Sequence, residues 1–496
     1  SGGLGGEPFS DGAKEAFFFM AMLGCALIVG DGCITPVISV LGALEGVGGG
    51  DGGRFVSIDV AVAVVILLLV FAAQRHGSQF IGLCSGPVVV IWFLAIGGLG
   101  IYNLMSHPAE ASIVLQGLNP MKIVDLWTKG AFPGVRAWHS LSGVVLAVTG
   151  SEALYADMGH FGAGPITLAW FGLVYPCLVL QYLGQAAMLC VRPSGVSSPF
   201  YNAVPDNLRW PMTVLATLAA VVASQAMITG LFTMLTQAHA LRLVPRIRVL
   251  HTNPGEQGQV YIPEVNWALC AVCVVLCLAF RTSAALSGAY GIAVTCTFVV
   301  TTLLLSLVLR RAWRWRWPAV LVVIVPMLFV DVAICSSNLT KIAESGWVPV
   351  LIAAVICLAM HTHHWGHRHE EEVFEEEAKA EEAAMAVPGS WGVDLLSFPL
   401  VSSVPGLLHL LRTRPLPRTP TAAVFMTSLP WRVPPAVGMV ADMLGCLPQA
   451  IVLLNVRFED VPFVAEASRS SFGALGEGLF SIVLRFGYAE PITATT

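Results

Sequence analysis

Long apolar segments recur along the first 362 residues, separated by shorter polar connections. Ten of them approach or exceed the length of about 20 residues that a helix needs to cross a bilayer. They are residues 16–44, 55–73, 87–104, 141–159, 166–190, 212–238, 265–280, 286–309, 319–335 and 347–360. Because lipid offers a bare backbone no hydrogen bonds, segments this apolar must be helices, and the alternation that marks the strands of a membrane barrel is missing. The pattern predicts an all-α polytopic membrane protein.

The composition agrees with this class. Of 496 residues, 56% are apolar and only 11% are charged, and the mean hydropathy is +0.76, whereas soluble domains are about 25% charged. The net charge is -5, with no basic tract interleaved with aromatic residues, so no nucleic-acid partner is expected. The twelve cysteines lie mostly inside the apolar segments and are predicted to pack as small apolar residues. No disulfide framework and no cofactor are predicted.

Arginines gather in two short connections, residues 242–248 and 310–316. The positive-inside rule places both connections in the cytoplasm. Alternating outward from them puts the N-terminal residues and the C-terminal tail inside, and the long connection 106–139 outside.

The composition changes abruptly at His361. The stretch HTHHWGHRHEEEVFEEEAKAEEAAM holds five histidines in nine residues and then a run rich in glutamate. It is interpreted as a solvated helix next to the membrane, with a zinc or proton sensor as the alternative. Further along, TAAVFMTS, QAIVLLNVRFED and LFSIVLRFGYAE are typical of strands, and PPAVGMVADMLGCLP of a helix. These predict a small α/β domain, which carries no phosphate-binding glycine loop and is expected to have a regulatory or packing role.

An acid interrupts the first apolar segment. Asp31 stands between two glycines, about 22 Å into the segment at 1.5 Å per residue, and a group at that depth is a candidate for an ion or proton site. Thr35 and Ser39 follow at four-residue steps on the same helix face. The alternative is an acid at a helix end near the membrane surface. The glycines and Pro36 predict a tilt, a kink or an interruption of the helix here.

A second constellation lies in LAVTGSEALYADMGHFG, from residue 146 to 162. Thr149, Glu152 and Tyr155 follow one another at three-residue steps, so they face one way, and a helix interrupted near the glycine would free carbonyls for a cation. Asp157 lies about 140 degrees from Glu152 around a regular helix. Glu152 is therefore assigned an ion or proton role. Asp157 and His160 are assigned a role at the helix end or in a gate, with a structural pair as the alternative.

A third stripe runs through SQAMITGLFTMLTQ, where Gln225, Thr229, Thr233 and Gln237 recur at four-residue spacing. Such a stripe serves either as glue between helices or as part of an ion path, and both interpretations stay open. Ser224 and Gln225 lie deepest and are the candidates for a path.

Together these stretches resemble the KUP/HAK/KT family of potassium uptake transporters. The resemblance rests on GDGCITPVISVLGALEG, GSEALYADMGHFG, ASQAMITG, PRIRVLHTNPGEQGQVYIPEVNW and AYGIAVTCT, in family order. It implies the inverted five-plus-five repeat of the amino acid and cation permease superfamily (a LeuT-like fold) with a cytosolic C-terminal domain. It also implies uptake of potassium together with a proton, through a multi-pass protein of the plasma membrane that forms a homodimer through its C-terminal domain.

The resemblance also sets the expected organisation. Residues 1–15 would be a cytosolic loop remnant, 16–362 the transmembrane transport domain, 363–418 a linker rich in histidine and glutamate, and 419–496 the cytosolic α/β domain. Asp31 matches the acidic position of the third family helix and Glu152 that of the sixth. The first two family helices are missing, which suggests an incomplete chain.

The resulting hypothesis is potassium/proton symport, with the proton on Glu152. A potassium channel would need a filter of the TVGYG type, and a membrane hydrolase would need a motif such as HExxH; the sequence holds neither. Enzymatic activity is therefore not expected. A membrane sensor that transports nothing and uses the His-rich tail and the C-terminal domain is the remaining alternative.

Overall fold

The structure is a computed structural model that describes residues 11–46, 54–76, 78–128, 134–147, 150, 162–245, 247–251, 260–386, 403–413, 416–427, 432–459 and 464–487. The chain forms two compact units. The first comprises Ser1–Thr252 and Gly258–Thr362, and the second comprises Asn253–Gln257 and His363–Thr496.

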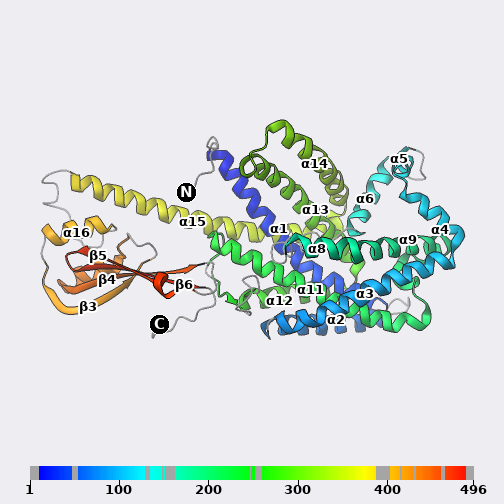
Figure 1. Ribbon diagram of the computed structural model, residues 1–496, viewed down its shortest axis with the longest axis horizontal. Coiled ribbons are helices and arrows are strands. Elements are labelled where there is room, and N and C mark those ends of the chain that lie inside the picture. Colours follow the sequence, from blue (N-terminus) through cyan, green and yellow to red (C-terminus); the bar gives the residue numbers. More distant parts are fainter. Residues whose placement is uncertain are drawn as a thin grey trace. The chain divides into compact units, whose positions relative to one another are not determined.

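The first unit is built of helices (Figure 1). They are α1 (Asp11–Leu44), α2 (Arg54–Ala73), α3 (Ser78–Ser106), α4 (Pro108–Leu115), α5 (Met121–Thr128), α6 (Val135–Ala147), α8 (Ala163–Ala169), α9 (Tyr175–Val191), α10 (Pro199–Asn202), α11 (Arg209–Ala240), α12 (Pro263–Phe280), α13 (Ser283–Leu307), α14 (Trp317–Leu339) and α15 (Trp347–Ala386), which continues into the second unit. Short helical turns join them: η1 (Gln74–His76), η2 (Gln116–Leu118), η3 (Trp170–Val174), η4 (Pro193–Ser197), η5 (Asp206–Leu208), η6 (Val308–Ala312) and η7 (Ile342–Gly346). A small antiparallel pair is formed by β1 (Leu250–His251) and β2 (Val260–Tyr261).

Eight helices in the described part of the chain are long and apolar enough to cross a membrane. They are Glu15–Leu44, Ser85–Ser106, Ala163–Val191, Asp206–His239, Pro263–Phe280, Ser283–Ala312, Trp317–Leu339 and Ile342–Glu370. The polytopic helical class is therefore confirmed. The sequence predicts ten spans. Of the other two, 55–73 matches the shorter apolar helix Ile58–Ala73, and 141–159 overlaps the shorter apolar helix Ala137–Ala147 only over residues 141–147, since α6 is described only as far as Ala147.

Helix α1 contacts α13, α11, α12 and α2 (Figure 1), so it is covered on several sides. Its glycines allow these close approaches. A Cβ added to Gly24 would meet Val300 of α13 at 3.1 Å, one added to Gly30 would meet the Pro349 carbonyl oxygen of α15 at 3.3 Å, and one added to Gly32 would overlap the Leu231 side chain of α11.

The sequence predicts a tilt, a kink or an interruption of this helix, and the structure shows no interruption. α1 is one α-helix of 34 residues with Pro36 inside it. Gly30 and Gly32, which the sequence presents as helix breakers, instead allow α15 and α11 to approach closely.

The second unit contains a four-stranded sheet with the strand order β3-β4-β6-β5. Its elements are α16 (Val404–Thr413), β3 (Arg418–Met426), α17 (Pro435–Leu444), β4 (Leu447–Glu459), α18 (Glu466–Arg469), β5 (Ser470–Gly476) and β6 (Leu479–Gly487). β3 and β6 pair with β4 in parallel, and the edge strand β5 pairs with β6 antiparallel. The predicted α/β character is confirmed, and β5 is an addition.

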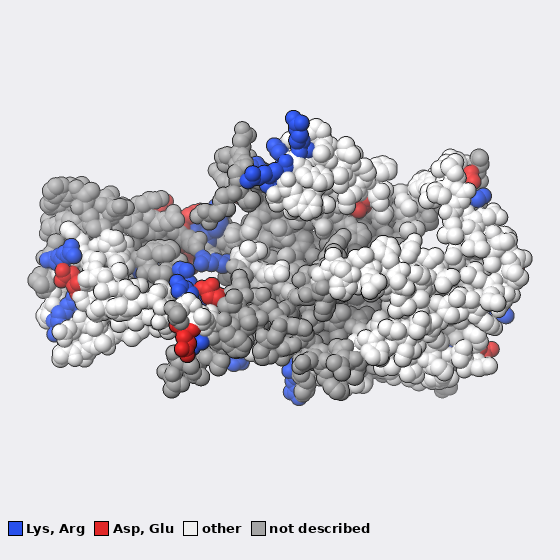
Figure 2. Space-filling model, viewed as in Figure 1, with Lys and Arg blue, Asp and Glu red and all other residues white. Residues whose placement is uncertain are grey.

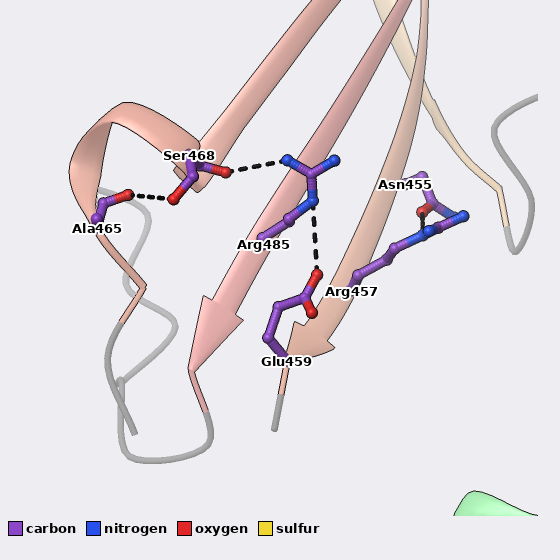
Figure 3. Close-up of polar contacts among 6 residues, drawn as sticks. All are labelled: Asn455, Arg457, Glu459, Ala465, Ser468 and Arg485. Atoms are coloured by element: carbon purple, nitrogen blue, oxygen red, sulfur yellow. Dashed lines mark hydrogen bonds and ion pairs between the residues drawn. The ribbon is translucent and has the colours of Figure 1, made fainter. Parts of the chain in front are cut away.

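Polar contacts connect the ends of the two central strands, β4 and β6 (Figure 3). The Arg485 guanidinium on β6 lies 3.5 Å from the Glu459 carboxylate on β4 and donates to the Ser468 carbonyl at 3.1 Å. Ser468 in turn donates to the Ala465 carbonyl at 3.0 Å. These contacts connect α18 with the sheet.

Charge on the first unit is sparse on the face shown in Figure 2, where the surface over α3 and α9 is mostly uncharged. Arginines gather at the turn between α13 and α14, which includes Arg310 and Arg311. Phe329 of α14 is 75% exposed, as expected of a helix whose outer face meets lipid.

Candidate functional site

The Asp31 carboxylate lies at the centre of the candidate site. Its side chain on α1 is only 2% exposed. The Thr35 hydroxyl, one turn along the same helix, donates to Asp31 Oδ1 at 3.1 Å. Ser39 lies a further turn along this face and is half-buried. Asp31 and Thr35 are thus brought together by the four-residue spacing that the sequence shows.

A small cavity adjoins this carboxylate. It is lined by Ile28 and Asp31 of α1 and by Val294, Thr297 and Phe298 of α13, and its volume is about 10 Å³, which is room for about one water-sized sphere. Thr297 was not predicted. Its hydroxyl donates to the Ala293 carbonyl at 2.9 Å, which leaves its lone pairs available to a cation.

The chemistry of this cavity suits a small dehydrated cation. A carboxylate and a hydroxyl supply oxygen ligands, the kind that hard cations prefer. The other three lining side chains are apolar, and such surroundings strengthen the attraction between an ion and the carboxylate relative to that in bulk water.

The site candidates on α11, Ser224 and Gln225, lie beside a different part of α1 from Asp31. Near the end of α1, Ala43 packs with Ala216 and Ala220 of α11, and earlier in α1, Gly32 faces Leu231. The two helices therefore run antiparallel, and Ser224 falls between these anchors, nearer the level of Ser39 than of Asp31.

The α11 hydroxyls bond within their own helix. Ser224 is fully buried and donates to the Ala220 carbonyl at 2.7 Å. Thr229 donates to the Gln225 carbonyl at 2.9 Å. The structure does not bring Ser224 or Gln225 to the cavity at Asp31.

The candidates of the second constellation, Thr149, Glu152, Tyr155, Asp157 and His160, lie outside the described residues. Their roles stay predictions. The preceding helix is placed: the Ser142 amide of α6 donates to Ser337 Oγ of α14 at 3.0 Å, and Ser337 Oγ donates to the Trp138 carbonyl at 2.8 Å. Helix α6 therefore approaches the bundle along α14.

A contact that was not predicted joins the end of α1 to the start of α13. Glu45 Oε1 accepts a hydrogen bond from the Ser283 amide at 3.0 Å, where a carboxylate also suits the positive end of the helix dipole. Nearby, the Tyr201 hydroxyl donates to the Ala43 carbonyl at 2.6 Å. Burial raises the pKa of Tyr201 to about 12; a hydrogen bond with Thr213 opposes the rise, and the charge of Glu45 adds to it.

Asp331, an acid inside a predicted span, was also not among the predicted site residues. It lies on α14, and Thr302 Oγ1 of α13 donates to its Oδ2 at 2.6 Å. The signal in the sequence was the acid itself, since residues 319–335 hold no other charged residue.

Comparison with known proteins agrees with this architecture. Residues 9–368 match the family model described as the K+ potassium transporter integral membrane domain, and residues 420–495 match the K+ potassium transporter C-terminal domain. The "Probable potassium transport system protein Kup" of Pseudomonas fluorescens is 39% identical over 96% of this chain and 70% of its own length. The protein of the same name from Myxococcus xanthus is 40% identical over 96% of this chain and 68% of its own length.

A third relative, "Probable potassium transport system protein Kup 1" of Geobacter sulfurreducens, is 37% identical over 96% of this chain and 71% of its own length. These matches extend over both units and include the stretches that carry the family resemblance. The chain therefore belongs to the K+ potassium transporter family, the KUP/HAK/KT family that its motifs resemble.

Proposed function

We propose that this protein takes up potassium ions across the plasma membrane, coupled to entry of a proton. Potassium uptake is supported by membership of the family and by the names of the relatives. The observation that carries the proposal is the cavity between α1 and α13, which is lined by Asp31, Thr297 and three apolar side chains.

Charge arithmetic supports the coupling to a proton. At about 100 mV, one inward charge gains roughly 2.3 kcal/mol, enough for about 50-fold accumulation of a monovalent cation. If a proton enters with the potassium ion, the electrical gain doubles to about 4.6 kcal/mol, or on the order of 10³-fold. Symport would therefore let a cell concentrate potassium from a dilute medium.

The roles within this proposal follow the sequence assignments. Asp31 contacts the potassium ion with Thr35 as its support, and Glu152 carries the proton. Asp157 and His160 act at a gate, in a LeuT-like inverted repeat. The C-terminal domain joins two copies of the chain. Charge-neutral Glu152→Gln is expected to abolish the pH dependence of uptake, and a variant with normal pH dependence would remove that assignment.

Rubidium uptake by cells that lack their own potassium uptake tests the proposal. Asp31→Asn should lower uptake at least about tenfold, because the amide cannot balance the charge of the ion. Asp125→Asn is the matched control, since Asp125 lies on α5 with an exposed side chain 3.8 Å from Lys122. Equal uptake by both variants would contradict the proposed site. A membrane-inserted wild type that never transports would favour the sensor alternative.

A further inference from the structure

Helix α14 carries a second intramembrane carboxylate, Asp331. It lies fourteen residues after Trp317, about 21 Å along the helix. Inserting an acidic side chain at such a depth raises the free energy by roughly 2.5 to 3.5 kcal/mol on insertion scales. Such a side chain usually has a partner or faces an ion. In the part of the chain that the structure describes, no basic side chain forms an ion pair with it. The nearest basic residues along its own helix and the next turn, Arg316 and Lys341, are ten residues or more away.

The partner of Asp331 is a hydroxyl. Thr302 of α13 is 4% exposed and donates to Asp331 Oδ2 at 2.6 Å, a length typical of a hydroxyl bonded to a carboxylate. Once its hydrogen is used, the threonine oxygen still has lone pairs, as do both carboxylate oxygens. The pair therefore offers oxygen acceptors and has no donor left.

A buried acceptor lies on the same face of α14 as the half-buried Asp331. Asn338, seven residues beyond Asp331, is 1% exposed. Its Nδ2 donates to the Ile334 carbonyl at 3.1 Å, which fixes the amide orientation because a flipped amide would set oxygen against oxygen. Oδ1 then points at Gly291 of α13, where a side chain would collide with it, and has no hydrogen-bond donor among the described residues. The seam between α13 and α14 thus holds a buried acceptor, Asn338 Oδ1, that has no donor among the described residues.

This seam is separate from the cavity at Asp31. Thr297, which lines that cavity, and Thr302, which meets Asp331, are five residues apart on α13. Five residues correspond to about 140 degrees around a regular helix. The two acids therefore flank α13 on different sides, one from α1 and one from α14.

We propose that Asp331 and Thr302 form a second site for a monovalent alkali cation, at the α13–α14 interface. The carboxylate is the charged ligand, and the threonine oxygen is the neutral one. The cation supplies the positive charge that Asp331 lacks among the described residues. Helix α13 contributes a threonine to both sites. An ion bound at one site therefore affects the position of α13 at the other site.

Equilibrium binding of radioactive rubidium to the full chain in lipid nanodiscs tests this site without requiring transport. The wild type is expected to show two classes of binding sites. Asp331→Asn should lose one class, whereas Asp31→Asn should lose the other. Thr302→Val should weaken the Asp331 class by about tenfold, and Thr302→Ser should restore it.

Asp125→Asn serves again as the control and should bind as the wild type does. The site is contradicted if Asp331→Asn binds the same amount of rubidium with the same affinity as the wild type. If that variant does not fold, an unchanged affinity in Thr302→Val overturns the proposal instead. Rubidium binding that is sensitive to Asp331 in a wild type that transports nothing would support this site and contradict only the proposed uptake.

Discussion

Adding one methyl group to Gly32 should disturb the packing that holds α1 against α11 beside Asp31. The Cβ of an alanine here would overlap Leu231 Cδ1 and lie 2.8 Å from Leu231 Cγ. Leu231 is 1% exposed, so it has little room to move. Overpacking of this kind costs about 1–3 kcal/mol. Replacing a helical glycine by alanine gains about 0.5–1 kcal/mol, so Gly32→Ala should be destabilising by about 1 kcal/mol, with an upper limit of about 2.5 kcal/mol.

The assay is equilibrium unfolding of purified protein, followed by tryptophan fluorescence, for the four members of a double-mutant cycle. Leu231→Ala alone should cost about 2–5 kcal/mol, because it leaves a cavity. In that background Gly32→Ala should instead be stabilising, since the new methyl group fills part of the cavity. The sign of the Gly32 effect therefore depends on residue 231.

Gly98→Ala is the matched control, because Gly98 lies within α3 with no atom near enough to meet an added Cβ. It should leave stability unchanged or slightly raised. If Gly32→Ala is as stable as the wild type, or if its effect keeps the same sign in both backgrounds, the close packing of α1 on α11 is refuted.

Three further predictions address other parts of the chain. Because the pKa of buried Tyr201 is raised to about 12, the stability that its neutral form contributes should be lost as pH rises from about 10 to about 12, and Tyr201→Phe should flatten this alkaline loss in an unfolding titration. Gly478→Ala should speed amide hydrogen exchange in β4 and β6, since Gly478 has a φ of +77° and its Cβ would collide with the Gln449 carbonyl; Gly473→Ala, whose Cβ would lie 3.9 Å from the nearest atom, should not. Thr297→Val should lower rubidium uptake about tenfold by removing the hydroxyl ligand; unchanged uptake would exclude Thr297 from the site.

The helices could be predicted because each depends on a local property, the length of an apolar run. The continuity of α1 could not. Gly30, Gly32 and Pro36 are usual helix breakers, and their effect depends on neighbours such as Leu231 and Pro349 that are distant in the sequence. A contact glycine and a breaking glycine look the same until the partner helix is placed.

The candidate site shows the same division. Asp31 and Thr35 could be paired from the sequence, because four-residue spacing on a helix brings side chains together. Thr297 and Thr302 could not, since the acids near them lie on other helices and nothing local to α13 distinguishes these hydroxyls from packing residues. Asp331 could be noticed in the sequence as the only charged residue of an apolar span. Its partner, Thr302, could be identified only from the structure.

The most direct test of the account is to locate rubidium ions in an experimental structure of the protein by their anomalous scattering. An anomalous peak is expected in the cavity between α1 and α13, within coordinating distance of the Asp31 carboxylate and the Thr297 hydroxyl. Rubidium bound at other places in a well-ordered structure, with that cavity empty at saturating rubidium, would contradict it.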